Sequence, residues 1–99
     1  MVTKEAILEA LKPVEDPEIG MSIVDIGLVY RAEDLEDAIE VDFTLTYPGC
    51  PLGEQIEEDI IDHLARAFHK AVRAKLVFEP AWTPDRMTED ARVGLGYPI

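Results

Sequence analysis

The chain has a single cysteine, Cys50, among its 99 residues. One thiol cannot form an internal disulfide. It also cannot supply by itself the four ligands of a tetrahedral zinc site or of an iron-sulfur cluster. Any chemistry of Cys50 therefore needs other residue types, a second copy of the chain or a partner protein.

Basic residues are scarce, since 9 lysines and arginines stand against 21 aspartates and glutamates, for a net charge of -12. This excess of negative charge repels nucleic-acid phosphates and anionic lipids, so we expect neither nucleic acid nor membrane as a partner. No apolar run approaches the roughly 18 to 20 residues of a membrane span. Residues 1–8 are amphipathic and do not resemble a signal peptide, so the sequence predicts a cytoplasmic protein.

Several common catalytic motifs are missing. The chain has no G-x-G-x-x-G, no Walker lysine loop and no G-x-S-x-G, which argues against the usual nicotinamide oxidoreductases, nucleotide hydrolases and serine hydrolases. It also has no internal repeat, low-complexity tract or Gly/Ser-rich linker. With 99 residues and 47% hydrophobic residues, residues 1–99 are expected to form one domain with one core.

Hydrophobic periodicity predicts three helices and three strands. Apolar residues recur every four positions from Leu52 to Phe68 and predict a long helix over 51–70. Thr3 is expected to cap a first helix that ends before Pro13, and Thr88 to cap a short last one. Strands are predicted over 27–32, 39–46 and 72–78, with a loop over 14–22 and an acidic connector over 33–37.

This order, α-β-β-α-β-α, predicts an α+β fold in two layers: a three-stranded mixed sheet with helices on one face. A right-handed crossover through the long helix is expected to join the second and third strands. The polar side of the second strand carries Glu40, Asp42, Thr44 and Thr46, and is either solvated or a subunit contact.

Cys50 lies in the segment that joins the clearest strand to the clearest helix. Proline is favoured at the first helical position, so Pro51 predicts that Cys50 is the N-cap residue. There, free N–H groups and the helix dipole would stabilise a thiolate, as a reactive or ligating cysteine needs. The alternative is that Cys50 is a small buried apolar residue.

Three carboxylates could accompany this thiol. Asp16 and Glu18 flank a proline in the predicted loop, and Asp25 interrupts the apolar run over 23–30. Such acids are either metal ligands beside the cysteine or caps that hold backbone N–H groups in the loop. His63 and His69 are six residues apart and off the apolar stripe, so we expect them to be solvated helix residues.

Five segments in this order and spacing resemble a small metal-sulfur cluster biosynthesis family, formerly catalogued as domain of unknown function fifty-nine. It includes the SufT-like and PaaD-like bacterial proteins and a eukaryotic cytosolic iron-sulfur assembly component. The segments are DPEIG at 16–20, SIVDIGLVY at 22–30, TLTYPGCP at 44–51, EPAW at 79–82 and RMTEDAR at 86–92. The chain lacks the long N-terminal extension and additional cysteines of the PaaD-like branch.

The resemblance implies a non-catalytic accessory role in iron-sulfur cluster assembly or transfer, with a cluster or iron bound transiently. Cys50 would be the ligand or transfer thiol, and the expected partners are an assembly scaffold or recipient proteins. A homodimer would donate Cys50 twice. The polar residues that the resemblance groups around the thiol are Asp16, Glu18, Asp25, Thr44 and Thr46.

Two alternatives stay open. One is a metal-free adaptor, whose acidic surface recognises a basic client. The other is a thiol enzyme with Cys50 as nucleophile and Asp16 or Glu18 assisting. The enzyme is disfavoured because neither His63 nor His69 is placed by the sequence to act as the base.

Overall fold

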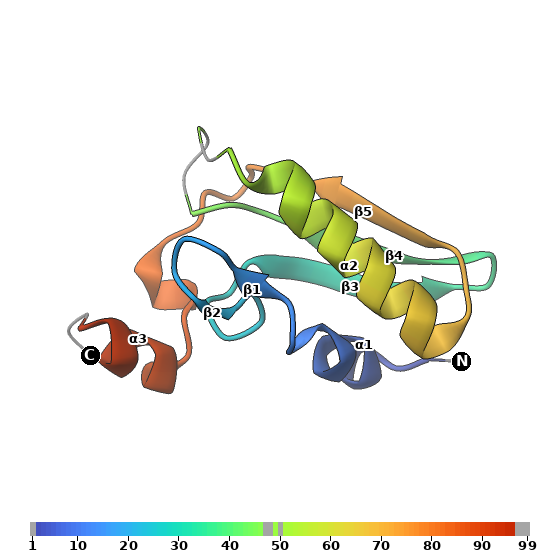
Figure 1. The fold of residues 1–99 in the computed structure, drawn as a ribbon, viewed down its shortest axis with the longest axis horizontal. Helices are drawn as coiled ribbons and strands as arrows, with labels where there is room; N and C mark the ends of the chain where they lie inside the picture. The colour runs from blue at the N-terminus through green and yellow to red at the C-terminus, as the bar shows by residue number, and fades with distance from the viewer. Residues whose placement is uncertain (1, 47–48, 50, 97–99) are drawn as a thin grey trace.

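The fold is built on a three-stranded mixed sheet (Figure 1). The computed structural model describes residues 2–46, 49 and 51–96 of the chain. Strands β3 (Val29–Leu35), β4 (Ala38–Phe43) and β5 (Val72–Leu76) lie in the order β3-β4-β5. β3 and β4 are antiparallel, whereas β4 and β5 are parallel. The α+β class, the mixed sheet and the crossover through the long helix are confirmed.

Two helices cover one face of this sheet (Figure 1). Helix α1 (Lys4–Leu11) packs against β3, α2 (Gly53–Phe68) packs against β5, and the two helices contact each other. Helix α3 (Glu89–Leu95) lies beyond the end of the sheet instead, near the hairpin of strands β1 (Glu15–Asp16) and β2 (Met21–Ser22). The expectation of helices on one face therefore holds for α1 and α2.

The core forms between the inner face of β4 and the apolar stripe of α2. Residues at alternate positions of β4 and at every fourth position of α2 are fully buried, as the periodicities of the two elements require. They are Ile39, Val41 and Phe43 of β4 and Ile56, Ile60 and Leu64 of α2. The two periodic segments of the sequence therefore pack on each other.

Both short helices begin where the sequence predicts. Thr3 Oγ1 accepts a hydrogen bond from Ala6 N at 3.1 Å, and Thr88 Oγ1 accepts one from Ala91 N at 3.2 Å. Each hydroxyl satisfies one of the N–H groups that a helix start leaves unpaired. No helix in the described part of the chain is long and apolar enough to cross a bilayer.

The predicted loop over 14–22 is wrong in part, because it contains a small antiparallel hairpin. Its strands are β1 (Glu15–Asp16) and β2 (Met21–Ser22). Two-residue strands are too short to show the alternation by which a sequence reveals a strand.

The predicted acidic connector over 33–37 is also wrong in part, because β3 begins at Val29 and continues to Leu35. Asp34 accepts hydrogen bonds from Lys70 Nζ and, at 2.8 Å, from Val2 N, and its side chain is 4% exposed. Glu33 pairs with Arg31 at 2.6 Å. Acidic residues have a low propensity for strands, and these partners stabilise them in β3.

The chain after β5 crosses back over the connection between β2 and β3. Trp82 Nε1 donates to the carbonyl of Ile26 at 2.7 Å, and Thr88 N donates to the carbonyl of Asp25 at 2.8 Å. Gly27 has a φ of +77°, and a Cβ there would lie 2.3 Å from the carbonyl oxygen of Arg86. This close approach requires glycine.

We expect Gly27→Ala to destabilise the fold far more than its matched control, Gly20→Ala. Gly20 has the same φ of +77°, but a Cβ there meets nothing within 4 Å. Gly20→Ala should lower the free energy of unfolding by about 1–2 kcal/mol through backbone strain alone. Gly27→Ala should lower it by about 2–5 kcal/mol, because overpacking adds to that strain. Urea denaturation of both variants measures the difference, and equal losses would contradict the tight contact with Arg86.

Candidate functional site

The carboxyl end of β4, which leads into the segment carrying Cys50, is joined to the β1–β2 hairpin. Thr44 N donates to the carbonyl of Leu28 at 2.8 Å, and Leu28 N donates to the carbonyl of Ile23 at 2.9 Å. Ile23 N in turn donates to the carbonyl of Val14 at 2.9 Å. The hairpin and the end of β4 therefore form one hydrogen-bonded frame.

Asp16 shapes the turn of that hairpin. Its carboxylate is buried, and Oδ1 accepts a hydrogen bond from Glu18 N at 2.9 Å. Its carbonyl accepts hydrogen bonds from Ile19 N at 3.1 Å and Gly20 N at 2.7 Å. Of the two interpretations of this acid, the structure shows the cap of backbone N–H groups. Glu18 is exposed on the same turn.

Thr44 carries a buried hydroxyl that is unpaired within the described part of the chain. The residue is 1% exposed, and Oγ1 has no hydrogen-bond partner among the residues that the structure describes. Leaving such a group unpaired costs about 1–3 kcal/mol, and such groups are rare in folded proteins. Thr46 is half-buried two residues further on. The frame therefore holds, just before the cysteine segment, a hydroxyl that no other described residue uses as a hydrogen-bond partner.

Cys50 itself lies outside the described residues. The prediction that it caps the long helix is wrong, because α2 begins at Gly53 and its N-cap residue is Leu52. Leu52 packs against the core, and a Cβ on Gly53 would lie 3.3 Å from Leu45 Cδ1. Packing of the first turn thus decides where the helix begins, against the preference of proline for the first helical position.

Asp25 belongs to a different part of the surface. It lines a cleft of about 610 Å³ together with Lys12, whose Nζ lies 3.8 Å from Asp25 Oδ1. The residues that line this cleft are Lys12, Glu15, Met21, Ser22, Asp25, Thr88, Asp90 and Ala91. The lining of this cleft includes none of the other four polar residues that the resemblance groups with Cys50, which are Asp16, Glu18, Thr44 and Thr46.

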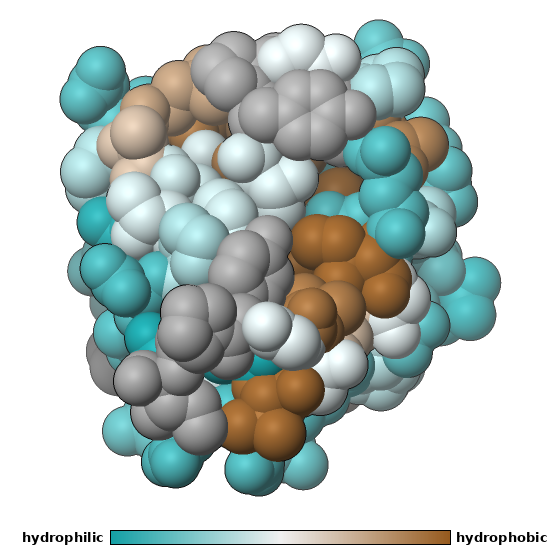
Figure 2. All heavy atoms as spheres, turned by 90° about the vertical axis from the view of Figure 1, so that its left-hand side faces the viewer, coloured by the Kyte–Doolittle hydropathy of each residue, from teal (hydrophilic) through white to brown (hydrophobic). Residues whose placement is uncertain are grey.

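The end of the molecule that carries the hairpin and α3 has a mixed surface. Figure 2 shows apolar side chains reaching this surface between hydrophilic ones. On α3, Val93 and Leu95 are exposed.

Neither histidine belongs to a group of metal ligands among the described residues. Among residues 2–46, 49 and 51–96, no set of three or more His, Cys, Asp or Glu side chains could hold a metal ion. His63 Nδ1 lies 3.0 Å from the carbonyl oxygen of Asp59 within α2. His69 is exposed and ends α2 in the left-handed conformation, with a φ of 54°.

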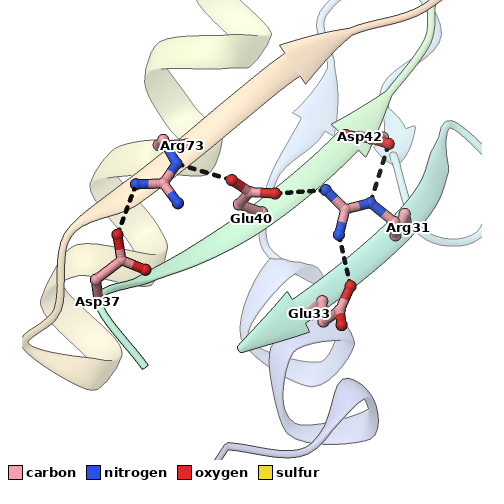
Figure 3. Close-up of polar contacts among 6 residues, drawn as sticks. All are labelled: Arg31, Glu33, Asp37, Glu40, Asp42 and Arg73. Atoms are coloured by element: carbon pink, nitrogen blue, oxygen red, sulfur yellow. Dashed lines mark hydrogen bonds and ion pairs between the residues drawn. The ribbon is translucent and has the colours of Figure 1, made fainter. Parts of the chain in front are cut away.

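The sheet face opposite α1 and α2 carries a network of ion pairs centred on Arg31 (Figure 3). Its guanidinium binds three carboxylates: Glu33 and Glu40, each at 2.6 Å, and Asp42 at 3.1 Å. These contacts, that with Glu40 foremost, raise the pKa of Arg31 above its ordinary value. One arginine thus joins β3 to β4 on this face.

Arg73 extends the network to β5. Its Nε binds Glu40 at 2.8 Å, and its Nη1 binds Asp37 at 3.2 Å. Glu40 accepts hydrogen bonds from Arg31 and Arg73, and these lower the pKa of its carboxyl, that from Arg31 most. A sequence alone could not reveal these pairs, because they depend on the register of three strands.

The comparisons with known proteins point to one family. Residues 4–76 match the model of the family described as iron-sulfur cluster assembly protein. The chain belongs to this family. The resemblance stated from the sequence motifs is thereby confirmed.

Two relatives are similar over most of their length. The chain is 37% identical to an Fe-S protein maturation auxiliary factor of Porphyromonas gingivalis, over 96% of this chain and 92% of the relative. It is 41% identical to the Fe-S protein maturation auxiliary factor SufT of Staphylococcus aureus, over 84% of this chain and 97% of the relative. The crystal structure of a domain of unknown function from Bacillus anthracis is also similar. It has a TM-score of 0.89 and 31% identity, over 96% of this chain and 92% of that one.

We expect Arg31→Met to raise the pKa of Glu40. In the intact network this pKa is lowered, so the ionised carboxylate stabilises the fold at pH values above the pKa of an unfolded glutamate. That stability is lost as the pH falls through the lower, folded pKa. NMR titration of the Glu40 carboxyl measures the shift. The control is Lys75→Met, since no ion pair of Lys75 is found in the described chain. An equal shift in both variants would contradict a specific role of Arg31.

We expect Thr44→Val to stabilise the protein. Valine has nearly the shape of threonine and removes a buried hydroxyl that no described residue binds, so the free energy of unfolding should rise by about 1 kcal/mol. Thr46→Val, at the half-buried neighbour, is the control and should change stability by less than about 0.5 kcal/mol. Chemical denaturation compares the two variants. A loss of stability in Thr44→Val would mean that the hydroxyl has a partner in solution.

Proposed function

We propose that this protein is an accessory factor that helps to assemble iron-sulfur clusters or to transfer them to recipient proteins, with Cys50 as the ligand or transfer thiol. The observation that carries the proposal is the similarity, over most of both chains, to two proteins named Fe-S protein maturation auxiliary factors. The cluster is then cargo and not a resident cofactor. Its partners are an assembly scaffold and the recipient proteins.

The single thiol sets the chemistry of this role. Iron-sulfur clusters are commonly held by four cysteine thiolates, and each chain supplies one. Two chains in a homodimer would donate Cys50 twice and leave the other positions to thiols of the scaffold or recipient. Such incomplete ligation favours release of the cluster over storage. A free thiol also suits the reducing cytoplasm, where we place the protein.

The polar residues around the end of β4 support the proposal. The Thr44 hydroxyl has no partner among residues 2–46, 49 and 51–96, and we assign it as a hydrogen-bond donor to sulfur during transfer, with Thr46 assisting. Asp16 holds the hairpin turn, and Glu18 is exposed on that turn and could complete the ligand shell. Hydrogen bonds to sulfur tune the potential of a cluster and the reactivity of a thiolate. We assign Asp25 to the neighbouring cleft.

Anaerobic reconstitution with iron and sulfide tests the role of Cys50. We expect the intact protein to gain a visible chromophore that co-elutes with a dimer, because two chains must share one cluster. Cys50→Ala and the closer mimic Cys50→Ser should stay colourless, since neither offers a thiolate. Absorbance spectra and mass in solution measure both properties, and intact protein alkylated with iodoacetamide is a further control.

Two results would contradict the ligand role. A colourless monomer for intact protein and variants alike would favour the metal-free adaptor. Unchanged maturation of an apo-recipient by Cys50→Ala would do the same. The rate of iodoacetamide alkylation against pH then separates the adaptor from a thiol enzyme, because an enzyme needs an activated thiolate.

A further inference from the structure

Strand β5 has an open edge. It pairs with β4 on one side, and no strand pairs with its other side within the described residues. Figure 1 shows β5 as the outermost strand beside α2. An unpaired edge presents a row of backbone donors and acceptors that can bind another extended chain.

The direction of these groups follows from the pairing with β4. Ile39 N donates to the carbonyl of Ala71 at 2.9 Å, and Val77 N donates to the carbonyl of Phe43 at 2.8 Å. Backbone groups alternate in direction along a strand, so those of Val72, Ala74 and Leu76 point to the open edge. Three residues of β5 are thus available to a further strand.

The two faces of β5 differ in chemistry at this edge. The outer face carries Arg73 and Lys75, and both residues are exposed. The face toward α2 carries apolar residues, and near the carboxyl end Leu76 is 36% exposed and Phe78 is 41% exposed. A segment that matches both faces needs acidic and apolar side chains at alternate positions.

Strand β4 already has that pattern. In the register of the sheet, Glu40 lies opposite Arg73 and Asp42 lies opposite Lys75. Arg73 already binds two carboxylates, Glu40 and Asp37, whereas no ion pair of Lys75 is found within the described chain. An acid on an added strand would therefore pair with Lys75 from the open side of β5, whereas Asp42 of β4 lies opposite it on the other side.

We infer that the open edge of β5 binds an extended acidic-apolar segment of a partner protein by strand addition. A second copy of the chain fits this edge poorly. An antiparallel pair of β5 strands would bring Arg73 and Lys75 of the two copies beside each other, and like charges on neighbouring strands repel. The inference goes beyond the proposed function, because it depends on no property of Cys50.

The edge leads toward the cysteine segment. β4 and β5 are parallel, so their carboxyl ends lie at the same end of the sheet. A Cβ on Gly53, at the start of α2, would lie 3.6 Å from Leu76 Cδ2. A segment bound along β5 would therefore bring one of its ends beside the start of α2, three residues after Cys50 in the sequence.

Two labelled synthetic peptides test the inference, one alternating Glu and Val and the other alternating Lys and Val. Fluorescence anisotropy should show binding of the Glu-Val peptide to the intact protein and none of the Lys-Val peptide. NMR should show shifted and exchange-protected amides at Val72, Ala74 and Leu76. Lys75→Glu should weaken binding of the Glu-Val peptide by about fivefold and favour the Lys-Val peptide.

Ala74→Pro separates strand addition from simple charge attraction. Proline removes an N–H group that faces the open edge and leaves the groups that face β4. We expect it to abolish binding of the Glu-Val peptide, with circular dichroism showing that the variant is folded. Equal binding of both peptides, or unchanged binding by Ala74→Pro, would overturn the inference. So would self-association of the intact protein that Ala74→Pro abolishes, because a second copy would then be the occupant.

Discussion

Burial of the inner face of β4 against α2 is the interaction on which the rest of the structure depends. Ile39, Val41 and Phe43 are fully buried, and each lies next to an outward-facing residue of the same strand. Fixing the apolar face therefore fixes the outer face, because a shift of one residue would exchange the two. The ion pairs of Glu40 and the position of Thr44 follow from that register.

Much of the fold could be predicted from local patterns. The alternation over 39–43 and the four-residue repeat of α2 each describe one packed surface, and the caps Thr3 and Thr88 act within one helical turn. The hairpin over 15–22 could not be predicted, because its two-residue strands are too short to show alternation. The acidic half of β3 could not be predicted either, because it depends on distant partners. Asp34, for example, owes its place in a strand to Lys70 and Val2.

Sequence patterns could nominate residues for the candidate site, but they could not give the spatial arrangement of those residues. Thr44 and Asp16 belong to one hydrogen-bonded frame, as a shared site requires. Asp25 is only nine positions from Asp16, yet it faces a cleft whose other wall comes from Thr88 and Asp90. That wall exists because the chain after β5 folds back over the connection between β2 and β3. No pattern in the sequence predicts that these two segments lie together.

The folding back of the chain after β5 also affects how the protein folds. The hydrogen bond from Trp82 to Ile26 closes a separation of 56 residues, and the one from Tyr30 to Pro80 closes 50. Contacts so distant in sequence must overcome a large loss of chain entropy, and they slow folding. On a ribosome the connection between β2 and β3 emerges long before Trp82. The loop shaped around Gly27 is thus synthesised early, but its hydrogen bond with Trp82 forms only after the residues beyond β5 have been made.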